Sequence, residues 1–393
     1  MHILIIASWF KKSVEEVHAP FIEEQARMLM GAGLKVGVFH PYFIGGFKNR
    51  FKGSKKDIRY YDDNGLQTWY YGEMSVVPYF RKVIYNHLCK NAEKVFREYI
   101  KDNGMPDILH AHSVFMGGVV ANYLSMKYKI PYCITEHATK LITDFNFQNK
   151  MDVDFVRMTL GNSAKSIFVS LFQQQEMNKL YCIKKGNECV INNVLNPIFQ
   201  YQPFIKVKDQ FTITITGGLL ERKNHILLFH AIKLLKNRGF ECFVKIIGDG
   251  EIRKGLEQFV EINQLNKNIV FLGSLTRENV CKELINSHCL VSVSKFETFG
   301  VNLIEALGVG RPVISTNSGG PAEIVTIENG ILLKSYSVDE LAEAIIYLKK
   351  NYSNYNLQQI STDCHEKYSE VNISKQLLRL YTFVKKSHQI AIM

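Results

Sequence analysis

The chain lacks any apolar run close to the roughly 20 residues that a helix needs to span a bilayer. Its eight cysteines include no C-x-x-C pair and no metal-type cluster, so we expect free thiols in a reducing compartment and no zinc site. No G-x-G-x-x-G follows the first apolar stretch, which argues against an NAD-linked dehydrogenase. Short-period repeats and low-complexity segments are missing as well.

The composition is that of a globular protein with more than one core. With 393 residues, 46% of them hydrophobic and 22% charged, the chain predicts two domains of ordinary size. The apolar stretch 3–10 has no basic leader and is too short for a secretory signal, which predicts a buried first strand and a cytoplasmic protein. The net charge of +11 predicts an anionic partner, and charge alone leaves open nucleic acid, a nucleotide and an acidic membrane surface.

Short apolar strands alternate with helical segments along the chain. Residues 20–30 predict a helix that has proline in its first turn and is ended by Gly33. The strands predicted for the first half are 3–7, 36–39, 108–111, 132–135 and 167–170. Such alternation predicts a parallel sheet covered by helices on both faces.

The pattern restarts after an irregular polar stretch at 197–209. The strands predicted for the second half are 212–216, 244–247, 269–272, 290–294 and 312–315. We therefore predict two doubly wound α/β domains, 1–200 and 207–372, and a helix within 373–393 that crosses back to the first domain. Ligands of such sheets bind at the carboxyl ends of strands, so facing sheets would place the site in a cleft between the domains.

The segment 294–325 carries the strongest functional signal. Seven residues separate Glu297 from Glu305, E-T-F-G marks a helix start there, and Gly319-Gly320 follows the next strand. A helix start offers unpaired N–H groups and a partial positive charge, which suits a diphosphate, and Gly300 allows a ligand close to the backbone. Carboxylates on both sides of a phosphate cradle fit a nucleotide-sugar. The alternative is a surface helix with two solvated glutamates.

These residues resemble the retaining glycosyltransferases of family 4 (glycosyl transferases group 1), which have the two-domain GT-B architecture. The resemblance covers nearly the whole chain and is strongest in its second half. It implies that Glu297 lies by the donor sugar and that Glu305 holds the ribose hydroxyls. It also assigns the diphosphate to the backbone amides of Phe299, Gly300, Val301 and Asn302.

The family's G-R-L-x-x-x-K-G motif corresponds to residues 217–224, G-G-L-L-E-R-K-N. The resemblance makes Lys223 the lysine that binds the diphosphate, a role suited to a point charge. The chain departs from the motif at Gly218, where the family usually has arginine. We predict that Arg222 supplies the missing charge from the same loop. The alternative for Lys223 is a solvated side chain at a helix start.

Two further strand ends resemble the part of the family's site that holds the nucleotide base. Gly248 and Asp249 end the strand V-K-I-I-G-D-G, and backbone groups near Leu275 follow F-L-G-S-L. Taken alone, G-D-G is also a common turn between a strand and a helix.

Histidines in the first half are candidates for the opposite side of the site. His137, in T-E-H after an apolar strand, matches the family histidine that faces the donor sugar, although a structural role is the alternative. His110 and His112 lie on one side of a strand because side chains alternate, and without a third ligand we predict no metal there. His112 and His18, which lies in a first loop without the family's glycine pair, are candidates for the acceptor side.

We predict a metal-independent hexosyltransferase that needs no cofactor and uses His137, Lys223 and Glu297 as catalytic residues. The resemblance implies retention, with the acceptor attacking from the face that the diphosphate leaves. The donor is expected to be a nucleotide-sugar with uridine favoured, and the acceptor a glycan or a lipid-linked glycan in surface polysaccharide or glycolipid synthesis. The alternatives are a sugar-nucleotide epimerase of the same architecture and a non-catalytic nucleotide-sugar-binding protein.

Basic residues are candidates for contact with an anionic membrane surface or a lipid-linked diphosphate. Lys48, Arg50, Lys52, Lys55, Lys56 and Arg59 form a basic loop. Lys90, Lys94, Arg97 and Lys101 recur at helical spacing beside the apolar residues 84, 88, 95, 96 and 100. We thus expect a cytoplasmic protein that is peripheral on the inner face of the plasma membrane, with an ordinary solvated helix face as the alternative. Nucleic acid is not expected, because no binding motif accompanies the charge.

Overall fold

The structure is a computed structural model that describes residues 1–11, 13, 19–44, 56–74, 81–145, 148–183, 186–203 and 210–392. Its contacts divide the chain into two compact units. The N-terminal unit comprises Met1–Val194 and Ile373–Met393, and the C-terminal unit comprises Leu195–Asn372. The domain ends predicted from the sequence are residue 200 for the first domain and residues 207 and 372 for the second, whereas the contacts divide the chain at 194/195 and 372/373.

The N-terminal unit is built on a mixed sheet. Its described strands are β1 (His2–Ala7), β2 (Lys35–Ile44), β3 (Lys56–Asp63), β4 (Leu66–Met74), β5 (Ile108–His112), β6 (Tyr132–Glu136), β7 (Lys165–Phe168) and β8 (Glu188–Val190). They follow the order β3-β4-β2-β1-β5-β6-β7-β8. Chain order reverses between β1 and β5, which are paired in parallel from Ile3↔Ile108 to Ala7↔His112.

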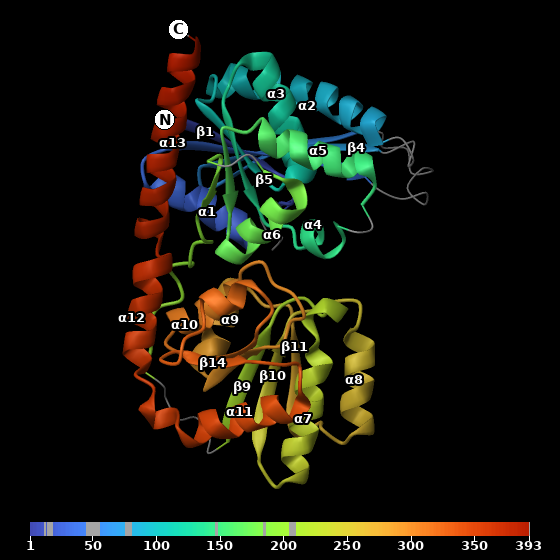
Figure 1. The fold of residues 1–393 in the computed structure, drawn as a ribbon, viewed down its shortest axis with the longest axis vertical. Helices are drawn as coiled ribbons and strands as arrows, with labels where there is room; N and C mark the ends of the chain where they lie inside the picture. Colours follow the sequence, from blue (N-terminus) through green and yellow to red (C-terminus); the bar gives the residue numbers. More distant parts are fainter. Residues whose placement is uncertain are drawn as a thin grey trace. The chain divides into compact units, whose positions relative to one another are not determined.

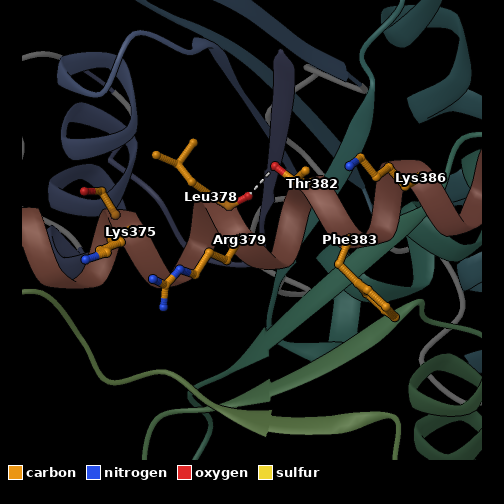
Figure 2. Close-up of a pocket in the computed structure, with 7 residues that line it drawn as sticks. Lys375, Leu378, Arg379, Thr382, Phe383 and Lys386 are labelled. Atoms are coloured by element: carbon orange, nitrogen blue, oxygen red, sulfur yellow. Dashed lines mark hydrogen bonds between the residues drawn. The ribbon is translucent and has the colours of Figure 1, made fainter.

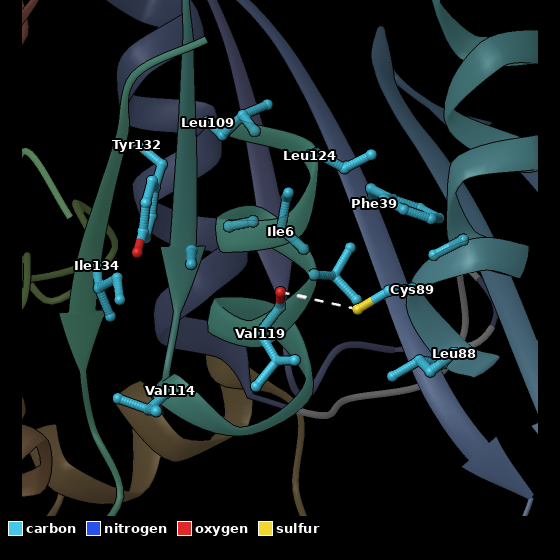
Figure 3. Close-up of a cluster of buried hydrophobic side chains, with 14 of the residues drawn as sticks. Ile6, Phe39, Leu88, Cys89, Leu109, Val114, Val119, Leu124, Tyr132 and Ile134 are labelled. Carbon is cyan, nitrogen blue, oxygen red and sulfur yellow. Dashed lines mark hydrogen bonds between the residues drawn. The ribbon is translucent and has the colours of Figure 1, made fainter. Parts of the chain in front are cut away.

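Helices cover both faces of this sheet (Figure 1). They are α1 (Pro20–Gly31), α2 (Arg81–Asn103), α3 (Val119–Tyr128, after an irregular turn at Val114–Gly118), α4 (Lys140–Thr143), α5 (Lys150–Gly161), α6 (Leu171–Tyr181) and α13 (Glu370–Ile392). One core layer lies under α2, α3, α5 and α6, and Figure 3 shows its centre around Ile6, Phe39 and Leu88. The other layer lies under α1 and α13, with Ile373 and Leu377 of α13 buried in it. The helix predicted within 373–393 therefore packs on the first sheet.

The C-terminal unit contains a parallel sheet in a doubly wound order. Its described strands are β9 (Phe211–Thr216), β10 (Cys242–Ile247), β11 (Ile269–Gly273), β12 (Cys289–Ser292), β13 (Val313–Thr316) and β14 (Gly330–Leu333). The order β11-β10-β9-β12-β13-β14 places the reversal between β9 and β12, where this type of sheet binds its ligands.

The helices of the C-terminal unit follow its strands. They are α7 (His225–Asn237), α8 (Arg253–Ile262), α9 (Arg277–Ile285), α10 (Val301–Gly308), α11 (Val338–Lys350) and α12 (Leu357–Tyr368), with 3₁₀ turns at Glu221–Lys223, Gly320–Glu323 and Tyr352–Asn354. The described core of this unit packs α7, α8 and α11 against one face of the sheet.

Most predicted elements are confirmed, and three predictions need correction. The first sheet is not wholly parallel, because β3 pairs with β4 in antiparallel fashion. Asn64 and Gly65 connect these strands with φ of 50° and 84°, the backbone of a tight hairpin that the Asn-Gly pair signals. The strand predicted at 167–170 ends at Phe168, since Ser170 caps α6 by accepting from the N–H of Gln173. The strand predicted at 290–294 ends at Ser292.

The outer face of α13 is basic and partly apolar. Lys375, Arg379 and Lys386 line a shallow groove there with the exposed ring of Phe383 (Figure 2). In the part of the chain that the structure describes, no helix has both the length and the apolarity that a bilayer crossing requires.

The predicted apolar face of helix α2 packs largely into the protein core. Leu88, Val95 and Phe96, from the predicted apolar face, are buried in the core of the N-terminal unit. On the exposed side Arg97 pairs with Glu93 at 2.5 Å and Lys101 with Glu98 at 2.7 Å. These contacts favour the ordinary solvated helix face. Of the predicted basic loop, residues 48–55 and the side chains of residues 56 and 59 lie outside the described residues.

Candidate active site

Three glycines lie at the strand ends of the candidate site. Gly217, Gly248 and Gly273 follow or end β9, β10 and β11, and each has a positive φ. The N–H of Gly217 donates to Ile247 O at 3.0 Å, and the N–H of Gly248 donates to Gly273 O at 2.8 Å. A Cβ at Gly248 would lie 2.0 Å from the carbonyl oxygen of Gly217, so only glycine fits. The strand ends are therefore held close together.

Lys223 meets Glu297 at the reversal of the sheet. The lysine ends the 3₁₀ turn after β9, and Asn224, with φ of 54°, redirects the chain into α7. The N–H of Lys295 donates to the Arg222 carbonyl at 2.8 Å, which ties this turn to the loop after β12. Lys223 Nζ and Glu297 Oε1 are 2.5 Å apart, and their side chains are only 17% and 11% exposed.

The ion pair controls the ionisation of Glu297. Burial alone would raise the pKa of this carboxyl group. The Lys223 ammonium and a hydrogen bond from Ser294 outweigh burial and hold the pKa of Glu297 below its ordinary value. A carboxylate and an ammonium thus stand in contact at the predicted donor position.

The loops around Glu297 and the start of α10 are joined by backbone pairing. The N–H of Glu297 donates to Ser318 O at 2.8 Å, and the N–H of Gly320 donates to Glu297 O at 2.9 Å. Gly300, the cap of α10, has φ of +122°, a conformation that side chains rarely adopt. A Cβ on Gly320 would lie 2.4 Å from Thr298 O. This packing holds the amides at residues 299–302 at an amino-terminal helix end, where such groups lack intrahelical acceptors.

Glu305 is held by an arginine that the sequence reasoning missed. Arg277, at the start of α9, donates to Glu305 Oε1 at 2.6 Å, and the two side chains are 19% and 6% exposed. The guanidinium also lies 4.8 Å from the ring centroid of Phe199. No motif marked Arg277, because its partners are distant in sequence and meet only in the fold. Each carboxylate of E-x7-E therefore has its own cation.

The remaining predicted donor residues lie at neighbouring strand ends. Arg222 is exposed beside Lys223, and Leu275 is half-buried after β11. Asp249 is exposed and pairs with Arg253 at 2.8 Å. The N–H of Gly250 and then Arg253 lower the pKa of Asp249. Around Gly218 a Cβ would meet only atoms at 3.7 Å or beyond, so a side chain fits there.

His137 and His112 are in contact in the N-terminal unit. His112 Nδ1 lies 3.0 Å from His137 Nε2, and the rings stack with centroids 5.2 Å apart. Beside them the buried Glu136 accepts hydrogen bonds from Ser113 Oγ and from the N–H groups of residues 114, 137 and 138. The backbone at His137 is therefore fixed by Glu136. His18 lies outside the described residues.

Comparison with known proteins identifies the family of this chain. Residues 21–197 match the family described as Glycosyltransferase Family 4, and residues 199–362 match the family described as Glycosyl transferases group 1. The chain belongs to the group 1 glycosyltransferases. The resemblance stated from the sequence motifs is thereby confirmed.

Relatives that align with most of this chain are also named as glycosyltransferases. An uncharacterized glycosyltransferase of Methanocaldococcus jannaschii is 28% identical over 333 residues, which cover 82% of this chain and 90% of that protein. The putative teichuronic acid biosynthesis glycosyltransferase TuaC of Bacillus subtilis is 26% identical over 88% of both chains. HepE of Anabaena, solved in complex with UDP and glucose, aligns with a TM-score of 0.73 and 16% identity over 97% of this chain and 99% of its own. The predicted GT-B fold, two Rossmann-like domains, is confirmed.

The glycosyltransferase thus carries its predicted site residues in two groups. Lys223, Glu297, Glu305 and the amides at 299–302 belong to the C-terminal unit, and His112 and His137 belong to the N-terminal unit. Within the described residues no group of three or more His, Cys, Asp or Glu side chains has an arrangement that could hold a metal ion.

Proposed function

We propose that this glycosyltransferase moves a hexosyl group from a UDP-sugar to a glycan or a lipid-linked glycan, with retention and without a metal. The observation that carries the proposal is the Lys223–Glu297 pair, which lies beside the amino-terminal end of α10. A similar fold binds UDP and glucose in HepE, and TuaC is named for teichuronic acid biosynthesis. Both likenesses favour a nucleotide-sugar donor and a role in surface polysaccharide or glycolipid synthesis.

Lys223 would exchange partners when the donor binds. Its ammonium is paired with Glu297, and a diphosphate with more negative charge would draw it away. The N–H groups of residues 299–302 would donate hydrogen bonds to the same diphosphate at the partial positive charge of the helix end. Charge that develops on the leaving diphosphate would then be stabilised by groups already in position.

The two carboxylates would hold the two ends of the donor. Glu297, released from Lys223, would accept hydrogen bonds from the sugar, and Glu305 would accept them from the ribose hydroxyls. Arg277 already occupies Oε1 of Glu305, so we assign the ribose to Oε2. The base would lie near Gly248, Asp249 and Leu275.

Transfer would proceed without a covalent intermediate on the protein. We propose that the acceptor attacks from the face that the diphosphate leaves, with Glu297 and Glu305 as donor-binding groups. His137 would contact the sugar, and His18 remains a candidate for the acceptor side. His112, the other candidate predicted from the sequence, is fully buried between Gln25 and His137 and would act on the acceptor only through His137. The net charge of +11 would favour a peripheral position on the anionic inner face of the plasma membrane and a lipid-linked acceptor.

Incubation with a panel of UDP-sugars tests the function. Transfer to a glycan or glycolipid acceptor with retained anomeric configuration is expected, and it should persist in the presence of EDTA. Lys223→Met should reduce transfer by roughly a hundredfold or more, as for other groups that stabilise a leaving charge. Lys236→Met is the matched control, because Lys236 is a surface lysine that donates to the carbonyl of Gln264. Epimerised sugar without transfer, or binding without turnover, would contradict the proposal.

A further inference from the structure

Buried polar side chains connect helix α13 to the strand that precedes His137. The hydroxyl of Tyr381 lies 2.6 Å from His110 Nδ1, and His110 Nε2 lies 2.8 Å from Thr135 Oγ1. Tyr381 and His110 are fully buried, and Thr135 is nearly so. All three residues belong to the N-terminal unit.

The same cluster continues through Gln25 of α1 to His137. Gln25 Nε2 lies 3.4 Å from both His110 Nδ1 and His112 Nε2. His112 Nδ1 lies 3.0 Å from His137 Nε2. Gln25 is 6% exposed and His112 is fully buried, so the polar atoms of this cluster must satisfy one another.

Tyr381 determines the direction of the first hydrogen bond. Burial raises the pKa of its hydroxyl well above the ordinary value, so the proton stays on the oxygen. Among the described residues, His110 is the hydrogen-bond partner of this hydroxyl, and a buried O–H without an acceptor is costly. Tyr381 therefore donates to His110 Nδ1. His110 must carry its proton on Nε2 and donate it to Thr135 Oγ1.

The remaining directions follow one after another. The Gln25 atom that faces the lone pair on His110 Nδ1 must be the amide NH₂, and this group also faces His112 Nε2. His112 therefore accepts at Nε2 and has its proton on Nδ1, which points to His137 Nε2. Burial keeps the imidazoles neutral, because it lowers the pKa of His110 and His137 to about 3 and that of His112 well below its ordinary value.

We propose that this network holds His137 as the tautomer with its proton on Nδ1, with Tyr381, His110, Gln25 and His112 as positioning residues. The inference rests on the proposed function in one respect, namely that His137 meets the donor sugar. Since its Nε2 lone pair is taken by His112, His137 acts as a hydrogen-bond donor and not as a general base. The group that meets its Nδ1–H must be an acceptor, such as a hydroxyl or ring oxygen of the hexose.

Imidazole nitrogen spectra of the full chain labelled with ¹⁵N-histidine test the inference without any ligand. Protons are expected on His110 Nε2, His112 Nδ1 and His137 Nδ1, with each residue assigned by a His→Gln variant. His40 is an internal reference for Nδ1–H, because its Nδ1 lies 2.7 Å from Ala7 O. His288 is the opposite reference, since its Nδ1 accepts from the N–H of Thr212. A proton on His137 Nε2, or on both of its nitrogens, would overturn the proposal.

Removal of one hydroxyl provides a second test. Without Tyr381 the reversed set of hydrogen bonds becomes equally satisfied, so Tyr381→Phe should give two tautomers of His137. It should lower kcat roughly two- to tenfold and change KM little, as expected when one hydrogen bond is lost. Tyr181→Phe is the matched control, because it removes a buried hydroxyl that donates to Leu141 O. A single unchanged tautomer in Tyr381→Phe would refute the network.

The network and the proposed function can fail separately. If His137→Ala leaves transfer unchanged while the wild-type spectra show the Nδ1 proton, the network stands and the role of His137 in transfer fails. If His137→Ala abolishes transfer while the spectra show the Nε2 proton, the function stands and the network fails.

Discussion

Removing the ammonium from the Lys223–Glu297 pair should destabilise the C-terminal unit in a pH-dependent way. In Lys223→Met the Glu297 carboxylate stays buried and keeps the hydrogen bond from Ser294 and the positive charge of Arg222. Loss of one partner from a fully buried pair costs about 3–5 kcal/mol, and exposed pairs contribute about 1 kcal/mol or less. With side chains that are 17% and 11% exposed, we expect a loss of about 2–3 kcal/mol at neutral pH.

The sign of the pH dependence follows from the pKa of Glu297. In the wild type this pKa is lowered, so the pair stabilises the fold above the ordinary carboxyl pKa and the effect is lost as pH falls. In Lys223→Met burial, the largest influence on this pKa, is opposed by Ser294 and Arg222 without the lysine, so we expect the pKa of Glu297 to rise above its ordinary value and the variant to lose stability as pH rises. The difference between the two proteins should therefore shrink from neutral pH towards about pH 4.

Hydrogen exchange by mass spectrometry on peptides from β9 and β12 measures the free energy of unfolding of the C-terminal unit. Both tryptophans, Trp9 and Trp69, belong to the N-terminal unit, and their fluorescence transition is the control that should not move. The double variant Lys223→Met/Glu297→Gln should lose less than the sum of the single variants by about 1–2 kcal/mol. Additive losses in the double variant would refute the reasoning. So would an equal loss of stability in Lys223→Met at neutral pH and at about pH 4.

Three further outcomes are expected in the C-terminal unit. Gly300→Ala should lower its free energy of unfolding by about 1–3 kcal/mol because φ there is +122°, whereas Gly255→Ala, with no atom within 4 Å of the new Cβ, should be neutral or stabilising; hydrogen exchange measures both, and equal effects would contradict this. Arg277→Met should weaken UDP binding about tenfold in calorimetry because the predicted ribose carboxylate loses its partner, and the surface control Arg238→Met should not; equal affinities would be inconsistent with that role. Gly218→Arg should tighten UDP binding by up to about tenfold, since a Cβ at Gly218 meets no atom closer than 3.7 Å and the family's arginine would add a positive charge, and weaker binding would contradict this.

Much of the fold was predictable because its signals are local. Apolar strands bounded by helix signals, such as residues 3–7 and 212–216, depend on neighbours in the chain, and the structure has them as β1 and β9. The antiparallel strand β3 was missed although Asn64-Gly65 signals a hairpin, because the surrounding segment has little apolar alternation. The family resemblance assigned Lys223 and Glu297 to one donor site through two separate motifs, at 217–224 and within 294–325, but it did not predict their ion pair.

The sequence by itself determined the family, the alternation of strands and helices, and the residue types of the predicted donor site, because these depend on order and spacing along the chain. Only the tertiary structure decided which cation pairs with each carboxylate and which nitrogen of His137 carries its proton. Arg277 and Glu305 are 28 residues apart, and Tyr381 and His110 are 271 residues apart. Hydrogen bonds and ion pairs depend on distance and burial, and no local pattern encodes these for residues that meet only after the chain has folded.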